Sequence, residues 1–134
     1  MAIINSASTK LSEKALLKKI LLICGTLSSL LYIAINIVVP MQWEEYSISS
    51  QTVSELSAIG APTRPLWVGL CMLYILLFAV FGYGVLKSAD GNRPMRIMGY
   101  LILAYSIINL YWPPMHLRGT GPTLTDTLHI ALAV

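Results

Sequence analysis

The chain has 134 residues and a formal net charge of +3, and 56% of its residues are hydrophobic while only 11% are charged. About a quarter of the residues in a typical soluble domain are charged, so this composition excludes an ordinary soluble protein and predicts a single membrane domain over residues 1–134. Nucleic acid is not an expected partner, because the basic residues flank the apolar runs and do not form one patch.

The first apolar run covers residues 20–39, which matches the roughly 20 residues that a helix needs to cross a bilayer. It is too long for the hydrophobic region of a secretory signal, and no small-residue cleavage site follows it before Pro40. We therefore expect a retained membrane span. Asn36 lies about one turn before its end, where a polar side chain is expected to hydrogen-bond a neighbouring helix.

The loop from residue 41 to residue 65 contains a helix signal. Thr52 and Glu55 have the spacing of a capping box, in which each side chain binds the other residue's backbone N–H, and Gly60 then supplies a stop. Apolar and serine side chains fall on different sides of this helix. The pattern predicts a short amphipathic helix at the outer membrane interface, or else a loop that only covers the helix ends.

Two further apolar runs cover residues 66–86 and 95–112, with Arg96 at the start of the latter as their one charged residue, and they predict the second and third spans. Gly69, Gly82 and Gly84 in the second span are expected to allow close approach of a neighbouring helix. Turn-forming residues cluster between the two runs, so a tight connection is expected.

A fourth apolar segment covers residues 125–134. Thr123 and Asp126 repeat the capping-box spacing and predict a helix start. Ten helical residues extend about 15 Å, half of a bilayer core, so this span is partial and the chain is expected to be C-terminally incomplete. The predicted fold is an all-α polytopic transmembrane helical bundle with three full spans, a partial fourth and a short external interfacial helix.

Charge asymmetry predicts the orientation of the spans. Seven of the nine basic residues would lie on one side of the membrane, before the first span or between the second and the third. These are Lys10, Lys14, Lys18, Lys19, Lys87, Arg93 and Arg96. By the positive-inside rule this side, with the N-terminus, is predicted to be the cytoplasmic face of a plasma membrane.

With this orientation, polar residues from all parts of the chain converge on the outer side. Ionisable residues in or beside a membrane are costly, so such a cluster is a functional-site hypothesis. Its members are Asn36, Ser54, Glu55, Asn109, His116, Arg118, Asp126 and His129. Arg118 is a candidate ligand for a lipid phosphate, and a solvated loop arginine is the alternative.

Asp126 and His129 are three residues apart, and a helix places such a pair on one face. A carboxylate beside an imidazole orients the ring, which suits a general base or a metal ligand. Two simpler roles stay open, namely a helix cap for Asp126 and a structural hydrogen bond for His129. A metal site needs a third ligand, for which Glu55 or His116 is available, and the sequence identifies no particular metal or cofactor.

Two stretches carry a family resemblance: SISSQTVSELSAIGAPTRPLW from Ser47 to Trp67, and PPMHLRGTGPTLTDTLHIALA from Pro113 to Ala133. Together they resemble the DUF998 family of bacterial and archaeal multi-pass membrane proteins, which has no established function. The resemblance implies membrane residence and importance for the serine-rich loop and the segment with both histidines. Members of this family generally have further transmembrane helices, so it also implies that the chain corresponds to an N-terminal portion.

Two functions follow from these patterns. The first is an integral membrane protein of uncharacterised function whose outward-facing polar pocket binds a lipid head group or small polar ligand. The alternative is a membrane-embedded lipid hydrolase that uses Asp126 and His129 with or without a metal. Spacing singles out no nucleophile, so an enzymatic activity is not decided. The lipid bilayer is the expected partner, and the sequence does not indicate an oligomeric state.

Overall fold

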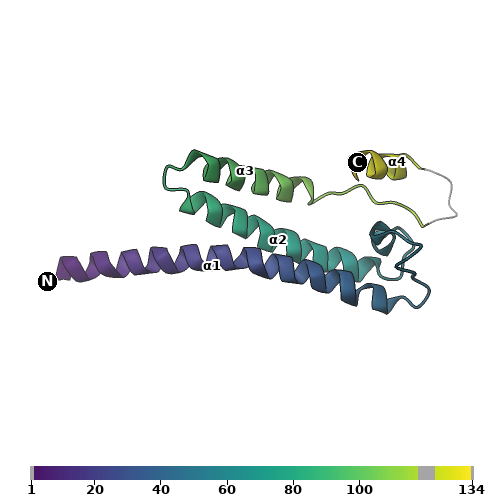
Figure 1. Cartoon of the computed structure of the whole chain (residues 1–134), viewed down its shortest axis with the longest axis horizontal. Coiled ribbons are helices and arrows are strands. Elements are labelled where there is room, and N and C mark those ends of the chain that lie inside the picture. The colour runs from purple at the N-terminus through teal and green to yellow at the C-terminus, as the bar shows by residue number, and fades with distance from the viewer. Residues whose placement is uncertain (1, 118–122, 134) are drawn as a thin grey trace.

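The computed structural model describes residues 2–117 and 123–133 of the chain, and in them all regular structure is helical (Figure 1). The all-helical fold class predicted from the sequence is therefore confirmed. In chain order the elements are α1 (Ala2–Val38), the 3-10 helix η1 (Pro40–Gln42), the 3-10 helix η2 (Val53–Ser57), α2 (Arg64–Ser88), α3 (Arg93–Ile108) and α4 (Leu124–Ala133).

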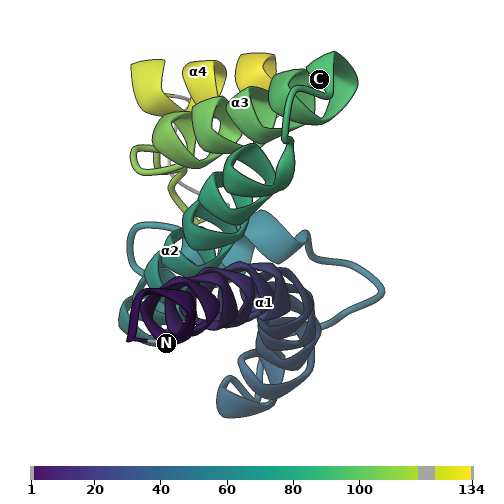
Figure 2. The same cartoon turned by 90° about the vertical axis from the view of Figure 1, so that its left-hand side faces the viewer.

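The three longest helices lie side by side in a row, with α2 between α1 and α3 (Figure 2). Within the described residues, two segments are long and apolar enough to cross a membrane: Ser12–Gln42, which contains most of α1, and Arg64–Ser88, which is α2. Few residues of either are buried, 17% of the apolar window in the first and 22% in the second, unlike those of a core helix in a soluble protein. α1 extends well beyond the connection between α2 and α3 (Figure 1).

The prediction of three full spans and a partial fourth is not confirmed. α3 has 16 residues, and at 1.5 Å per residue it extends only about 24 Å. It ends at Ile108, before the predicted boundary, where the Asn109 amide turns back to bind the Tyr105 carbonyl oxygen at 2.9 Å. The following prolines then disfavour helical backbone at Trp112. α4 is a separate helix of ten residues.

Glycines bring the helices of the row close together, as predicted for the second span. A Cβ atom on Gly84 would lie 2.6 Å from the Cβ of Leu21 in α1, and one on Gly82 would lie 2.7 Å from a side-chain carbon of Ile102 in α3. Larger residues at these positions would push the helices apart. Gly69 differs, because nothing in the described structure lies within 4 Å of the corresponding position.

The connection between α2 and α3 is a tight turn, as predicted. Asp90 and Gly91 have φ values of 40° and 90°, and the Asn92 side chain caps α3 by accepting a hydrogen bond from the Met95 N–H at 3.1 Å. The Lys18 ammonium lies 2.8 Å from the Asp90 carboxylate. This contact places the lysine-bearing part of α1 and the turn at the same end of the row. We call it the turn end.

At the opposite end, which we call the site end, η2 packs onto the ends of α1 and α2. Leu56 of η2 is fully buried in a cluster with Ile35 and Val39. The predicted capping box of Thr52 and Glu55 is present. The predicted amphipathic helix is, however, a single 3-10 element of five residues, since the backbone at Ala58 is already extended.

The segment after α3 is tied to the residues after η2 by a short parallel bridge. The Ile59 N–H donates to the Met115 carbonyl at 2.7 Å, and the Leu117 N–H donates to the Ile59 carbonyl at 3.4 Å. The chain therefore runs back from α3 across the site end before α4 begins. This path brings the two segments predicted to carry function into contact.

Candidate functional site

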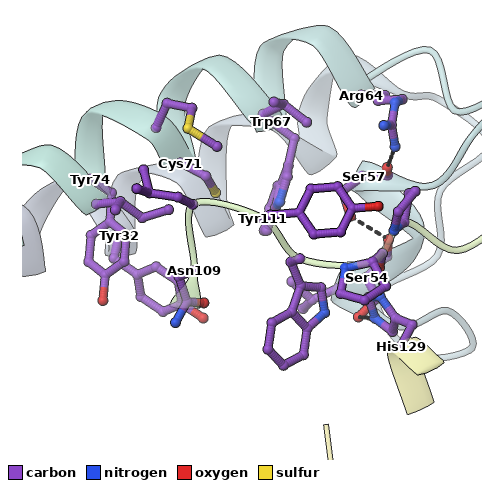
Figure 3. A pocket seen from close by; sticks show the side chains of 18 of the residues that line it. Tyr32, Ser54, Ser57, Arg64, Trp67, Cys71, Tyr74, Asn109, Tyr111 and His129 are labelled. Carbon is purple, nitrogen blue, oxygen red and sulfur yellow. Dashed lines mark hydrogen bonds between the residues drawn. The ribbon is translucent and has the colours of Figure 1, made fainter. Parts of the chain in front are cut away.

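A cavity of about 520 Å³ lies at the site end, between the first half of α2, η2, the segment after α3 and single side chains of α1, α3 and α4. Figure 3 shows that its lining changes in character from one end to the other. Polar side chains gather at one end, aromatic rings stand in the middle, and tyrosines and an amide occupy the far end. These groups are, in order, Ser54, Ser57, Arg64 and His129; Trp67 and Tyr111; Tyr32, Tyr74 and Asn109.

His129 is the side chain that α4 contributes to the cavity, and only 6% of it is exposed. Its Nδ1 atom lies 2.6 Å from the Pro113 carbonyl oxygen, and its Nε2 atom lies 3.1 Å from Ser54 Oγ. The ring of Trp112 meets the imidazole edge to face at 5.8 Å between ring centres. Both ring nitrogens are therefore engaged by groups far away in the sequence.

Local sequence explains how these groups are presented. The proline pair after α3 holds the backbone extended and supplies the Pro113 carbonyl oxygen without a competing N–H. α4 starts at a capping box, in which the Asp126 carboxylate accepts from the Thr123 N–H at 2.8 Å and the Thr123 hydroxyl oxygen accepts from the Asp126 N–H at 3.3 Å. This confirms the predicted helix start and fixes the direction in which His129 projects.

The predicted pairing of Asp126 with His129 is wrong. One carboxylate oxygen of Asp126 accepts from the backbone N–H of His116 at 2.7 Å and lies 3.3 Å from the ring of the same residue. The other oxygen accepts from the Thr123 N–H and hydroxyl group. The Asp126 carboxylate, in the first turn of α4, points back toward the capping residue Thr123, whereas His129 projects into the cavity. Asp126 therefore holds the preceding loop and does not orient His129.

Glu55 and Ser54 are neighbours with different roles. Glu55 is 1% exposed, and its carboxylate accepts from the Thr52 N–H at 3.2 Å and from the Gln51 amide at 3.0 Å. Burial, followed by the charge of Glu55, raises the pKa of the nearby Tyr46 hydroxyl. In the described residues, Ser54 lines the cavity and Glu55 does not, so of these two neighbours Ser54 alone belongs to the predicted polar pocket.

The remaining predicted site residues are less closely associated. The Asn36 amide donates to the Tyr32 carbonyl of its own helix at 2.8 Å, and so it does not join two helices as predicted. Asn109 also bonds within its own helix, but it lines the cavity. The His116 ring lies 3.4 Å from the Thr123 hydroxyl. Arg118 lies outside the described residues.

No group of three or more His, Cys, Asp or Glu side chains that could hold a metal ion is found in residues 2–117 and 123–133. The candidate metal ligands predicted from the sequence do not come together, because the two histidines contact different groups. His116 contacts Asp126 and Thr123, while His129 contacts Pro113 and Ser54. Glu55 binds the backbone of its own loop.

A single family model covers both sequence segments that contribute to this site, residues 47–67 and 113–133. The model of the family described as "Protein of unknown function (DUF998)" matches residues 26–134, which is more than half of the chain. The chain belongs to the DUF998 family. No curated protein and no solved structure matches it.

The DUF998 match begins inside α1 and includes every residue of the cavity. Of the residues that line the cavity, the sequence predicts only Ser54, Asn109 and His129 as site residues. A feature of the sequence points to Arg64, because it is one of only two basic residues outside the predicted cytoplasmic side. No feature of the sequence points to the Pro113 carbonyl oxygen or to the contact between Ser54 and His129. Ser54 and His129 are 75 positions apart, and no spacing rule applies at that separation.

Proposed function

We propose that this DUF998 protein is an integral membrane protein of the plasma membrane that binds a lipid in the cavity at its site end. α1 and α2 are long and apolar enough to span the bilayer, and side chains such as Ile20 and Ile33 are more than half exposed. A lipid environment would satisfy these surfaces. In this proposal α3 also crosses the membrane, α4 enters it, and the lysine-bearing turn end with the N-terminus is cytoplasmic.

The change in lining along the cavity is the observation that supports this proposal. A lipid has a polar head and an apolar body, and the cavity offers serine, arginine and histidine side chains at one end and mainly aromatic rings beyond them. Pockets of several hundred Å³ are the usual size for small-molecule ligands. A small polar ligand would use only the polar end.

Arg64 is the residue expected to recognise the head group. It is the first residue of α2, and one guanidinium N–H donates to the Ser57 carbonyl oxygen. A guanidinium has five N–H donors in a planar fork, which suits two-point binding of a phosphate or carboxylate. The contact with Ser57 holds the fork at the cavity wall, where it would meet an anionic head group.

The hydrolase hypothesis in its original form, with Asp126 and His129 acting together, is not favoured by the geometry. The Asp126 carboxylate is occupied by the cap of α4 and the His116 N–H. A hydrolase would have to use different partners for His129. Lipid binding needs no such partner and is the function that we conclude from the site.

Native mass spectrometry of the protein released from detergent micelles tests this function. We expect wild-type protein loaded with phosphatidylglycerol to retain about one lipid, and Arg64→Gln to retain several-fold less. Arg93→Gln is the matched control, because Arg93 is an exposed arginine in the first turn of a helix at the turn end. Equal retention by wild type and Arg64→Gln, or no retention by wild type, would contradict the proposal.

A further inference from the structure

The contact between Ser54 and His129 has the geometry of a nucleophile and its base. Ser54 Oγ lies 3.1 Å from His129 Nε2, within the 2.6–3.2 Å that such pairs show. The two residues are 75 positions apart in the chain, and they belong to different elements, η2 and α4. The fold therefore builds a contact that neither segment has alone.

The Pro113 carbonyl fixes which nitrogen of His129 carries the proton. A carbonyl oxygen can only accept a hydrogen bond, so Nδ1 at 2.6 Å must be the donor. In the neutral ring Nε2 then has a lone pair, and the Ser54 hydroxyl donates to it. Pro113 thus takes the positioning role that a carboxylate has in a serine hydrolase triad.

The pair is also placed where a substrate could reach it. Both side chains line the cavity, at the end where Arg64 stands (Figure 3). His129 is otherwise shielded, with the Trp112 ring against its edge. A group lying in the cavity would meet Ser54 Oγ from one side while His129 supports it from the other. Arg64 lines the same end and supplies positive charge there.

We propose that Ser54 is a catalytic nucleophile and His129 its general base, acting on the carboxylic ester of a lipid held in the cavity. This inference rests on the proposed lipid-binding function. It replaces Asp126 by Ser54 as the partner of His129, and it requires no metal or other cofactor. The apolar part of the cavity would hold the acyl chain, and Arg64 would face the head group.

The reaction consists of two transfers. Ser54 Oγ forms a bond to the ester carbonyl carbon while its proton moves to His129 Nε2, and the bond from that carbon to the alcohol oxygen breaks as Nε2 returns the proton to the departing alcohol. A water molecule then gives a proton to Nε2 and its oxygen to the acyl carbon. The bond to Ser54 Oγ breaks, the serine regains its proton, and a fatty acid leaves.

Labelling by an ethyl fluorophosphonate probe tests the pair directly, since only an activated serine displaces fluoride from phosphorus at a useful rate. The whole chain in detergent is treated with the probe, and the adduct is located by peptide mass spectrometry. Hydrolysis of 4-nitrophenyl butyrate is followed in parallel. We expect the adduct on Ser54, and a general base contributes ~100-fold or more to the rate.

Three variants separate activation from a structural contact. Ser54→Ala should abolish labelling and turnover. His129→Gln can still donate to the Pro113 carbonyl and accept from Ser54, yet it cannot take a proton, so labelling should slow about 100-fold. Ser49→Ala changes an exposed serine of the same loop that does not line the cavity, and it should label as wild type does. Thermal unfolding of each variant confirms that it is folded.

The outcomes distinguish this inference from the function on which it rests. Labelling of Ser54 that depends on His129 supports the pair. Retention of phosphatidylglycerol without labelling or turnover overturns the pair and leaves lipid binding in place. Equal labelling of His129→Gln and wild type also overturns it. Loss of both lipid retention and labelling in the wild-type chain overturns both proposals.

Discussion

The turn end and the site end of the helical row are held together in different ways. At the turn end the connection between α2 and α3 is a local turn capped by Asn92, and α1 is joined to it by an exposed ion pair between Lys18 and Asp90, 72 positions apart. At the site end, segments distant in sequence meet through Leu56 in the core and His129 between two partners. Local signals suffice to build a connection, whereas long-range contacts are needed to build a cavity.

The largest expected difference between the ends comes from the core at the site end. Leu56 is fully buried, so Leu56→Ala should remove ~2–5 kcal/mol from the free energy of unfolding, through lost burial and the cavity left behind. Unfolding of the detergent-solubilised protein with denaturant measures this loss. Ile48→Ala, at a site that is 80% exposed in the same loop, should change stability by less than ~0.5 kcal/mol. Similar losses for the two variants would show that η2 is not packed as described.

Asp126 gives the second test, because its two roles predict different outcomes. If it only completed the capping box, Asp126→Asn would be nearly harmless, since the side-chain oxygen of Asn can still accept from the Thr123 N–H. Here one carboxylate oxygen accepts from the His116 N–H and the other from Thr123. An amide nitrogen cannot accept a hydrogen bond, so we expect Asp126→Asn to lower the thermal midpoint, though less than Leu56→Ala does.

A double-mutant cycle identifies the partner of Asp126. Asp126→Asn and Thr123→Ala should be non-additive, because they remove the same hydrogen bonds, while Asp126→Asn and Ser54→Ala should add. Coupling of Asp126 to Ser54 in place of Thr123 would argue that the carboxylate acts through His129 after all.

These contacts also show how much the sequence could predict. Both capping boxes were predicted and found, because Thr52 with Glu55 and Thr123 with Asp126 are three residues apart and need only one helical turn. The all-helical class followed from the apolar runs in the same way. The sequence also placed Ser54 and His129 in one cluster, but it could not pair them.

The failures have the same physical origin. The helical spacing predicts Asp126 as the partner of His129. Its partners in the structure are instead a carbonyl and a hydroxyl that tertiary packing brings to it. α3 was predicted to continue to residue 112, because hydropathy does not reveal where Asn109 turns back on the backbone. Local periodicity does not predict contacts that depend on the path of the whole chain.

The smallest expected effect is at the turn end, where the ion pair of Lys18 and Asp90 has side chains that are 37% and 77% exposed. Lys18→Gln should cost at most ~0.5 kcal/mol in the free energy of unfolding, and less at high salt, since exposed pairs are weak and screened. Replacing Asp90 tests more than the pair, because its φ of 40° lies in the left-handed region. Asp90→Asn keeps a residue that tolerates this conformation, so it should match Lys18→Gln, and Asp90→Gly should offset the lost pair by relieving the backbone. Unfolding at two salt concentrations measures these differences. A loss above ~1 kcal/mol for Lys18→Gln would mean that the turn end, too, depends on a long-range contact.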